Sequence, residues 1–282
     1  MTNRIKFSLV ALSVAAMLAG GPTTAQDEKA PVGEQDDVSK ALDSTATQWS
    51  FQFAYQQTDW KDDKFNGQTR PEGLDNYVQV RIVAPLVFDK LTILPRLTIR
   101  HYENANTGDS GWGNSELFGL IIPKGWDWGS GRGGIGPLVT TPGDEEVARD
   151  EWGYGLAGAL VNTSGDWFYG VLLTQSWRGI DPKTLPPTDS DTNPLGIAPF
   201  LNYQLGNGWY VGNGDMVINY DWKTSEWYVP LNLRFGRVLV GDKGSWNLYA
   251  EVGTSIVYDD WEGAAKDQSI RLNITRTIPV GF

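Results

Sequence analysis

The sequence predicts an all-β fold, a transmembrane antiparallel up-and-down β-barrel of about twelve strands. Short segments of alternating apolar and polar residues recur along the chain, and the connections between them alternate between short and long. The chain also carries 13 Trp, 11 Tyr and 10 Phe at a mean hydropathy of only −0.33. Barrel strands produce this combination because each strand has one apolar face toward lipid and one polar face toward the interior.

The N-terminus has the three zones of a secretory signal peptide. Arg4 and Lys6 precede an apolar stretch at 7–19, and small residues follow up to Ala25. The apolar stretch is too short to span a bilayer, so we expect cleavage after residue 25 rather than an anchor helix. Residues 26–46 are acidic and are expected to form a periplasmic tail or a plug segment. Residues 47–282 are expected to form the barrel in the bacterial outer membrane.

The charge and the cysteine content exclude some classes of protein. Removing the two basic residues of the signal peptide leaves 21 basic and 34 acidic residues, a net charge of −13. Such an acidic chain repels nucleic acid, whose binding depends on Lys and Arg at phosphates. The chain has no cysteine, so an exported form has no disulfide framework.

Alternation and turn residues divide the chain into strands. The expected strands are 47–57, 76–88, 91–102, 114–123, 127–140, 152–163, 166–177, 194–205, 208–219, 226–239, 246–258 and 268–282. Connections after the even-numbered strands are short, and those after the odd-numbered strands are longer, although 220–225 is short for its class. All tight turns therefore fall at one rim, as in outer-membrane barrels, which have an even number of strands. A secreted β-sandwich, the alternative, gives no reason for this rhythm.

The two faces of each strand differ in polarity because side chains alternate with a period of two. A charged side chain facing lipid near the midplane costs about 2–4 kcal/mol for Arg or Lys, so the apolar face is expected to point outward. The interior is then expected to carry these pore-lining residues: Arg81, Arg96, Arg100, Glu116, Arg132, Asp215, Arg234, Glu251 and Arg271. Arg276 falls on the apolar side of the last strand, where we expect it to extend toward a rim or to follow a bulge near Pro279.

Six arginines against three carboxylates predict a positive lumen. Fixed rings of Arg favour anions. Twelve strands make a narrow barrel, so the same side chains are also explained as ion-paired filler. The sequence is compatible with both interpretations, anion selectivity and ion-paired filling of the interior.

Aromatic residues near the strand ends predict two girdles at the membrane interfaces. The last strand ends in Phe282, which by resemblance to other barrels predicts recognition by the barrel-assembly machinery. The expected partners are outer-membrane lipid, lipopolysaccharide and a small-molecule solute. Acidic residues in two long connections are either solvated or hold divalent cations that bridge lipopolysaccharide: Asp144, Glu145, Glu146, Asp150, Glu151, Asp259, Asp260 and Glu262.

Enzymatic chemistry has little support in the sequence. His101 is the sole histidine, and Ser110 and Glu103 lie near it without the spacing of a nucleophile–base pair. The glycine-rich stretch at 129–136 lacks the Lys-Ser/Thr and the helix of a phosphate-binding loop, so we expect it to allow strand curvature or close approach of a plug. We therefore predict no enzyme, no catalytic residue, no cofactor and no metal site.

Several stretches resemble a bacterial family of outer-membrane transporters, the MetA-pathway of phenol degradation family. They are DVSKAL at 37–42, NYVQVRIVAPL at 76–86 with Val80 in place of a proline, GWGN at 111–114, WG at 128–129, GIGP at 134–137, WG at 152–153, PFLNY at 199–203, GW at 208–209 and WYVPL at 227–231. The resemblance implies a barrel for small solutes, aromatic or hydrophobic compounds among them. It supplies no assigned binding residues.

The predicted function is an outer-membrane channel for small solutes, which pass by diffusion through a narrow Arg-rich lumen. Two alternatives are an outer-membrane barrel enzyme that acts on lipid and a closed structural or adhesive barrel.

Overall fold

The computed structural model describes residues 36–43, 45–61, 64–65, 68–69, 73–104, 109–126, 128–178, 194–261 and 264–280. The predicted signal peptide (1–25) and Phe282 lie outside these residues, as do parts of several long connections.

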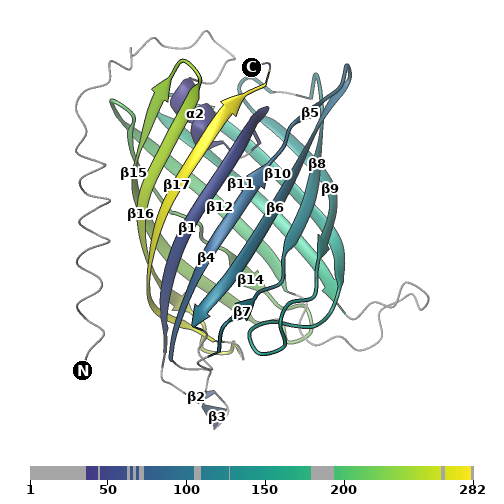
Figure 1. Ribbon diagram of the computed structural model, residues 1–282, viewed down its shortest axis with the longest axis vertical. Coiled ribbons are helices and arrows are strands. Elements are labelled where there is room, and N and C mark those ends of the chain that lie inside the picture. Colours follow the sequence, from purple (N-terminus) through teal and green to yellow (C-terminus); the bar gives the residue numbers. More distant parts are fainter. Residues whose placement is uncertain are drawn as a thin grey trace.

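A closed antiparallel β-barrel forms the body of the described chain (Figure 1). Each wall strand pairs with the next along the sequence, and β1 pairs with β17 to close the cylinder. Eleven wall positions are single strands: β1 (Gln48–Trp60), β4 (Gly73–Val83), β6 (Leu91–Asn104), β8 (Glu116–Pro123), β9 (Arg132–Thr140), β10 (Gly153–Ser164), β11 (Trp167–Arg178), β12 (Leu195–Gly206), β15 (Trp227–Gly241), β16 (Gly244–Val257) and β17 (Lys266–Pro279). The twelfth is shared by β13 (Trp209–Gly212) and β14 (Ile218–Tyr220). The predicted barrel of twelve strands is confirmed, and a sandwich of two stacked sheets is excluded.

Smaller elements decorate the wall. The strands β5 (Leu86–Val87) and β7 (Gly111–Trp112) pair with β6, whereas β2 (Lys64–Phe65) and β3 (Gln68–Thr69) pair with each other. The predicted second strand is split at Ala84-Pro85, because proline cannot donate a ladder hydrogen bond. The helix α2 (Asp37–Leu42) precedes the barrel. No helix in the described part of the chain is both long and apolar enough to cross a bilayer.

The two rims differ as the connection lengths predict. At one rim, hereafter the turn rim, Gly241 pairs with Gly244 and leaves a two-residue turn. Gly206, Asn207 and Gly208 adopt positive φ angles in another tight turn at the same rim, a conformation that glycine and asparagine tolerate best. Figure 1 shows α2 near the turn rim and β2, β3, β7 and β14 toward the opposite rim, hereafter the loop rim. The chain therefore enters and leaves the barrel at the turn rim.

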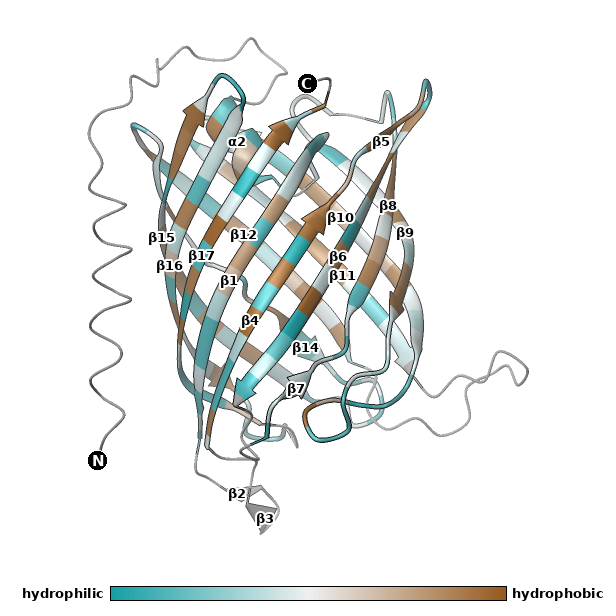
Figure 2. Cartoon of the chain, in the orientation of Figure 1, coloured by the Kyte–Doolittle hydropathy of each residue, from teal (hydrophilic) through white to brown (hydrophobic). Residues whose placement is uncertain are grey.

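Apolar side chains cover most of the outer surface. Leu233 is 62% exposed and Phe53 55%, whereas the inward Gln79 and Thr98 are each 1% exposed. Brown and teal residues accordingly alternate along the strands in Figure 2. Arg276 is on the outer face, as its sequence position predicts, and its guanidinium reaches the turn rim, where it lies over the Trp246 ring and donates to the carbonyl of Lys243 (2.6 Å). The register of β17 continues to Pro279 without a bulge.

Exposed aromatic residues form a belt near each rim. The following residues are exposed at or beside the turn-rim ends of strands: Trp49, Trp126, Trp128, Trp167 and Trp246. At or beside the loop-rim ends, the exposed aromatic residues are Trp112, Trp152, Tyr154, Trp177 and Trp227. Indole and phenol rings favour the headgroup level of a membrane. The two belts therefore bracket the apolar outer band.

One part of the interior is apolar, which departs from the simple alternation expected. On β4, β6, β8, β9 and β10 the inward face carries a cluster of buried apolar side chains that pack against one another. Its members are Val83, Leu94, Phe118, Leu120, Leu138, Ala157 and Ala159. Outward neighbours such as Leu117 are apolar too. Where these strands carry the cluster they are therefore apolar on both faces, and side chains fill this side of the interior.

Glycines in the stretch at 129–136 bring neighbouring strands close together. A Cβ on Gly136 would overlap the carbonyl oxygen of Gly119 on β8. Gly136 thus allows β9 to approach β8 closely beside the apolar cluster. The next element after β9 is a strand, β10, and not the helix that a phosphate-binding loop requires.

Candidate functional site in the barrel interior

The described part of the N-terminal segment lies inside the barrel. Asp36 caps α2 by accepting a hydrogen bond from the backbone N–H of Ser39 (2.9 Å). Ala41 packs against the inward side chains of Tyr210, Val238 and Tyr249 from β13, β15 and β16. The short helix is therefore buried against one side of the lumen near the turn rim.

Polar contacts tie this segment to two further parts of the wall. Arg132 on β9 pairs with the fully buried carboxylate of Asp43 and donates from Nε to the hydroxyl of Thr45 (3.1 Å). Gln204 on β12 donates to the hydroxyl of Ser39 (2.8 Å) and also reaches Asp36. Contacts to β9, β12, β13, β15 and β16 fix the segment across the interior.

A break in one wall strand places the central carboxylate. Residues 213–217 connect β13 to β14 outside the ladders of both neighbours, and of this segment the backbone N–H of Asn213 still donates to the carbonyl of Leu201 on β12 (3.1 Å). Gly214 has a φ of 71°, a conformation that glycine adopts freely. The backbone N–H of Asp215 donates to Oε2 of Glu251 (2.9 Å), which turns this segment into the lumen.

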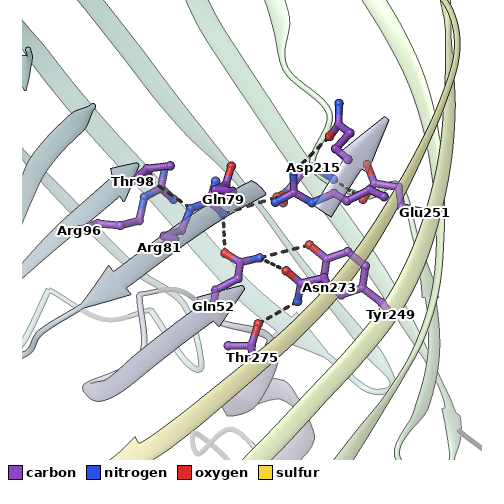
Figure 3. A network of polar contacts seen from close by, with 12 residues as sticks. Gln52, Gln79, Arg81, Arg96, Thr98, Asp215, Tyr249, Glu251, Asn273 and Thr275 are labelled. Atoms are coloured by element: carbon purple, nitrogen blue, oxygen red, sulfur yellow. Dashed lines mark hydrogen bonds and ion pairs between the residues drawn. The ribbon is translucent and has the colours of Figure 1, made fainter. Parts of the chain in front are cut away.

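Asp215 is shared by three arginines from three wall strands, and Figure 3 labels Asp215 and Arg81 of this group. Its carboxylate lies 3.0 Å from Arg234, 3.3 Å from Arg271 and 3.5 Å from Arg81. Glu251 pairs with Arg234 (3.2 Å) and accepts from the amide of Asn232 (2.6 Å). Buried charges are retained only when they are paired and hydrogen-bonded, and this cluster meets both conditions.

Neutral polar groups extend the network around the wall. Arg81 donates to Gln52 (3.0 Å) and to the hydroxyl of Thr98 (3.3 Å). Gln52 in turn donates to Asn273 (2.6 Å). Figure 3 shows these four side chains converging from β1, β4, β6 and β17. The lumen is thus crossed by one connected set of charged and amide groups.

Arg96 and Arg100 have weaker partners than the arginines that bind Asp215. Arg96 contacts Glu116 at 3.5 Å and lies over the ring of Phe118, 4.2 Å from its centroid. Arg100 donates to the neutral amide oxygen of Gln79 (3.1 Å). Both guanidiniums are therefore held with less negative charge nearby than Arg234.

A small cavity separates the N-terminal segment from the apolar wall. Its volume is about 10 Å³, and it is lined by Thr45, Leu94, Arg96, Phe118, Leu120, Ala159, Leu172 and Phe200. A single water molecule needs about this much space. This cavity therefore has no room for a larger solute while Thr45 stays in place.

The nine residues expected to line the pore all face the interior. Arg81, Asp215, Arg234, Glu251 and Arg271 meet in one cluster, Arg96 and Glu116 form a neighbouring pair, and Arg132 binds the N-terminal segment. Arg100 lies beside Gln79. Their role in selectivity stays a prediction.

Two features of the interior were missed by the sequence argument. The amides of Gln52 and Asn273 share the polar parity of their strands, and this parity was the signal that could have found them. The inward Phe118 and Leu120 had no such signal, because strands with two apolar faces do not reveal which face points inward.

His101 lies on the outer face of β6, away from the interior network. It pairs in register with Trp112, and its ring meets the edge of that indole at a centroid distance of 4.8 Å. The hydroxyl of Ser110 donates to the backbone carbonyl of Glu103. The residues near His101 thus form a packed aromatic contact, and their described hydrogen bonds do not assemble a nucleophile–base pair.

One acidic connection has a structural explanation. The carboxylate of Asp144 accepts from the backbone N–H of Trp112 (2.7 Å) and fastens the loop at 141–151 to β7. In the described ranges, no three His, Cys, Asp or Glu side chains are arranged to hold a metal ion. Glu262, part of the other acidic stretch, lies outside those ranges.

These features define a class by fold, the transmembrane β-barrel with a polar interior and an inserted N-terminal segment. No protein-family model matches the chain, and no curated protein matches it by sequence. Among solved structures, the chain is similar to the COG4313 outer membrane channel from Pseudomonas putida F1, with a TM-score of 0.59 and 16% identity over 92% of this chain and 100% of that one.

Two further structures match less well. The KdgM porin gives a TM-score of 0.47 at 10% identity over 80% of this chain and 98% of its own. Outer membrane phospholipase A from Escherichia coli gives 0.46 at 11% identity over 86% and 98%. At 16% identity, the match to the Pseudomonas channel shows that this chain has the fold of an outer-membrane barrel.

Proposed function

We propose that the protein is an outer-membrane channel through which small solutes diffuse passively along a narrow, arginine-rich lumen. The observation that carries the proposal is the connected charged network across the interior of a closed barrel. A barrel that served only as a scaffold would be at least as stable with apolar side chains in its interior, because buried ion pairs are often no more stabilising than hydrophobic packing. The fold shared with the Pseudomonas channel supports the same function.

The proposed location is the bacterial outer membrane, with the turn rim on the periplasmic side. Short turns face the periplasm in barrels of this class, and longer loops face outward. In this orientation α2 enters the lumen from the periplasm. The N-terminal segment then narrows the path without covering the loop rim.

Single-channel recording of the full-length protein in planar bilayers under a salt gradient tests the proposal. A positive lumen predicts a reversal potential displaced toward that of the anion. Changing Arg96 and Arg100 to Ala is expected to reduce this anion preference because both arginines have little compensating negative charge. Cation preference in the unaltered protein would contradict the assignment of the arginines, and absence of conductance would contradict the channel.

A lipid-directed enzyme is the second candidate, since His101 faces outward beside Trp112 at the level of the outer aromatic belt. Hydrolase activity toward phospholipid that disappears in a His101→Ala variant would support it. The hydrogen bond of Ser110 to a backbone carbonyl favours the channel instead. A closed adhesive barrel, the third candidate, predicts no conductance.

A further inference from the structure

Arg96 lies at the border between the charged network and the apolar wall. Its guanidinium lies over the ring of Phe118 and contacts Glu116 at 3.5 Å. The same side chain lines the small cavity together with Leu94, Leu120, Leu172 and Phe200. The positively charged guanidinium of Arg96 therefore borders the apolar surface that lines this cavity.

Arg81 is the neighbour of Arg96 across the β4–β6 ladder. Arg81 pairs in register with Thr98, and Arg96 follows two residues along the same face. Two like charges at such diagonal positions repel each other. An anion placed between them would relieve that repulsion.

Arg81 and Arg96 each have N–H donors that are available for a further hydrogen bond. Their hydrogen bonds to Asp215 and Glu116 are each 3.5 Å long, whereas Arg234 donates to Asp215 at 3.0 Å. A guanidinium offers five N–H donors. The buried Nε of Arg96 finds no hydrogen-bond partner among the residues that the structure describes.

Building on the channel function proposed above, we propose that the lumen contains a binding site for an amphipathic carboxylate. The carboxylate lies between Arg81 and Arg96, and its apolar body lies along Phe118, Leu120, Leu172 and Phe200. Arginine matches the planar, bidentate geometry of a carboxylate. The apolar wall supplies the contact area that ligand sites share with a few polar groups.

The N-terminal segment occupies part of this site. Thr45 lines the cavity, whose volume of about 10 Å³ is far too small for an organic acid. Arg132 holds Thr45 and Asp43 in place. The ligand and the N-terminal segment therefore compete for one space, and the site opens when Thr45 withdraws.

Inhibition of the chloride current by acetate, butanoate, hexanoate and octanoate tests the site in the full-length protein. Affinity is expected to rise about two- to fourfold for each added methylene, because each one buries more apolar surface. Hexanol, which has the apolar body without the charge, is expected to inhibit roughly tenfold more weakly than hexanoate. Equal inhibition by acetate and octanoate would overturn the proposal.

Arg96→Gln is expected to weaken hexanoate inhibition roughly 10- to 100-fold, because a charge-assisted hydrogen bond is lost. The increase in affinity from acetate to octanoate is expected to remain in this variant. Arg96→Lys keeps the charge without the bidentate geometry, so its affinity for hexanoate is expected to lie between that of the unaltered protein and that of Arg96→Gln. Arg276→Gln on the outer face is the matched control and is expected to leave hexanoate affinity unchanged. Unchanged affinity in both Arg96 variants would overturn the site.

Failure of the channel and failure of the site have different signatures. Absence of conductance contradicts the channel only. Calorimetric titration of hexanoate into the protein in nanodiscs, with empty nanodiscs subtracted, then measures the same chain-length and Arg96 dependence directly. No saturable heat with octanoate in that measurement would overturn the site.

Discussion

At the scale of single residues, Glu251 is the carboxylate most deeply embedded in the network. Its side chain is 4% exposed and it satisfies Arg234, Asn232 and the backbone N–H of Asp215 at once. Removing it leaves Arg234 with less compensation and frees the segment that carries Asp215. One side chain thus supports both the charge balance and the local backbone.

Glu251→Ala is expected to lower the free energy of unfolding by about 3 kcal/mol, the usual cost of breaking a buried ion pair. Urea-induced unfolding in lipid vesicles, followed by tryptophan fluorescence, measures the change. Glu145→Ala, at an exposed loop position, is the control and is expected to change stability by less than about 0.5 kcal/mol. Equal stability of the two variants would show that Glu251 is not essential to the network.

At the scale of elements, α2 owes its place to tertiary contacts rather than to its own helical tendency. A helix of six residues is too short to be stable in isolation. Ala41 packs on Tyr210 and Tyr249, while Asp43 and Thr45 are held by Arg132 from β9. The ion pair between Asp43 and Arg132 is therefore the polar tether between this segment and the apolar side of the wall.

Asp43→Ala is expected to increase single-channel conductance, because loss of the tether lets Thr45 leave the cavity more often. Recordings at fixed salt concentration measure the effect. Lys40→Ala is the matched control: this ammonium group is half exposed and pairs with Asp37 on the same helix. Conductance that rises equally in both variants would instead indicate general loosening of the segment.

The break between β13 and β14 is the second element with a functional consequence. A continuous strand would keep 213–217 in the wall, with side chains alternating between lipid and lumen. The interruption brings the backbone itself inward, so Asp215 reaches arginines on β4, β15 and β17. Local loss of ladder hydrogen bonds is offset by this charged contact.

At the scale of the whole molecule, the outer surface is a band suited to lipid. Leu233 lies near the middle of β15 and is one of the most exposed apolar residues. In water such a surface would drive aggregation, whereas in a bilayer it matches the hydrocarbon. We therefore expect the barrel to be stable only when lipid or detergent covers this band.

Leu233→Arg is expected to destabilise the barrel in vesicles by about 2–4 kcal/mol, the cost of Arg at the midplane. Phe88→Arg, at the turn rim, is the control and is expected to cost about 0–1 kcal/mol because headgroups and water are within reach. Urea unfolding in vesicles measures both changes. Equal costs would contradict the placement of the membrane around the middle of the strands.

The sequence by itself determined the number of wall strands, the two rims and the parity of the charged residues. These follow from local rules, since a period of two and turn residues act over a few neighbours. Only the tertiary structure decided that Asp215 meets three arginines and that β8 and β9 turn an apolar face inward. It also decided that the described residues of the N-terminal segment, 36–43 with Thr45 and Ala46, lie within the lumen. Those facts depend on contacts between strands far apart in the sequence, and on closure of the cylinder, which no local pattern encodes.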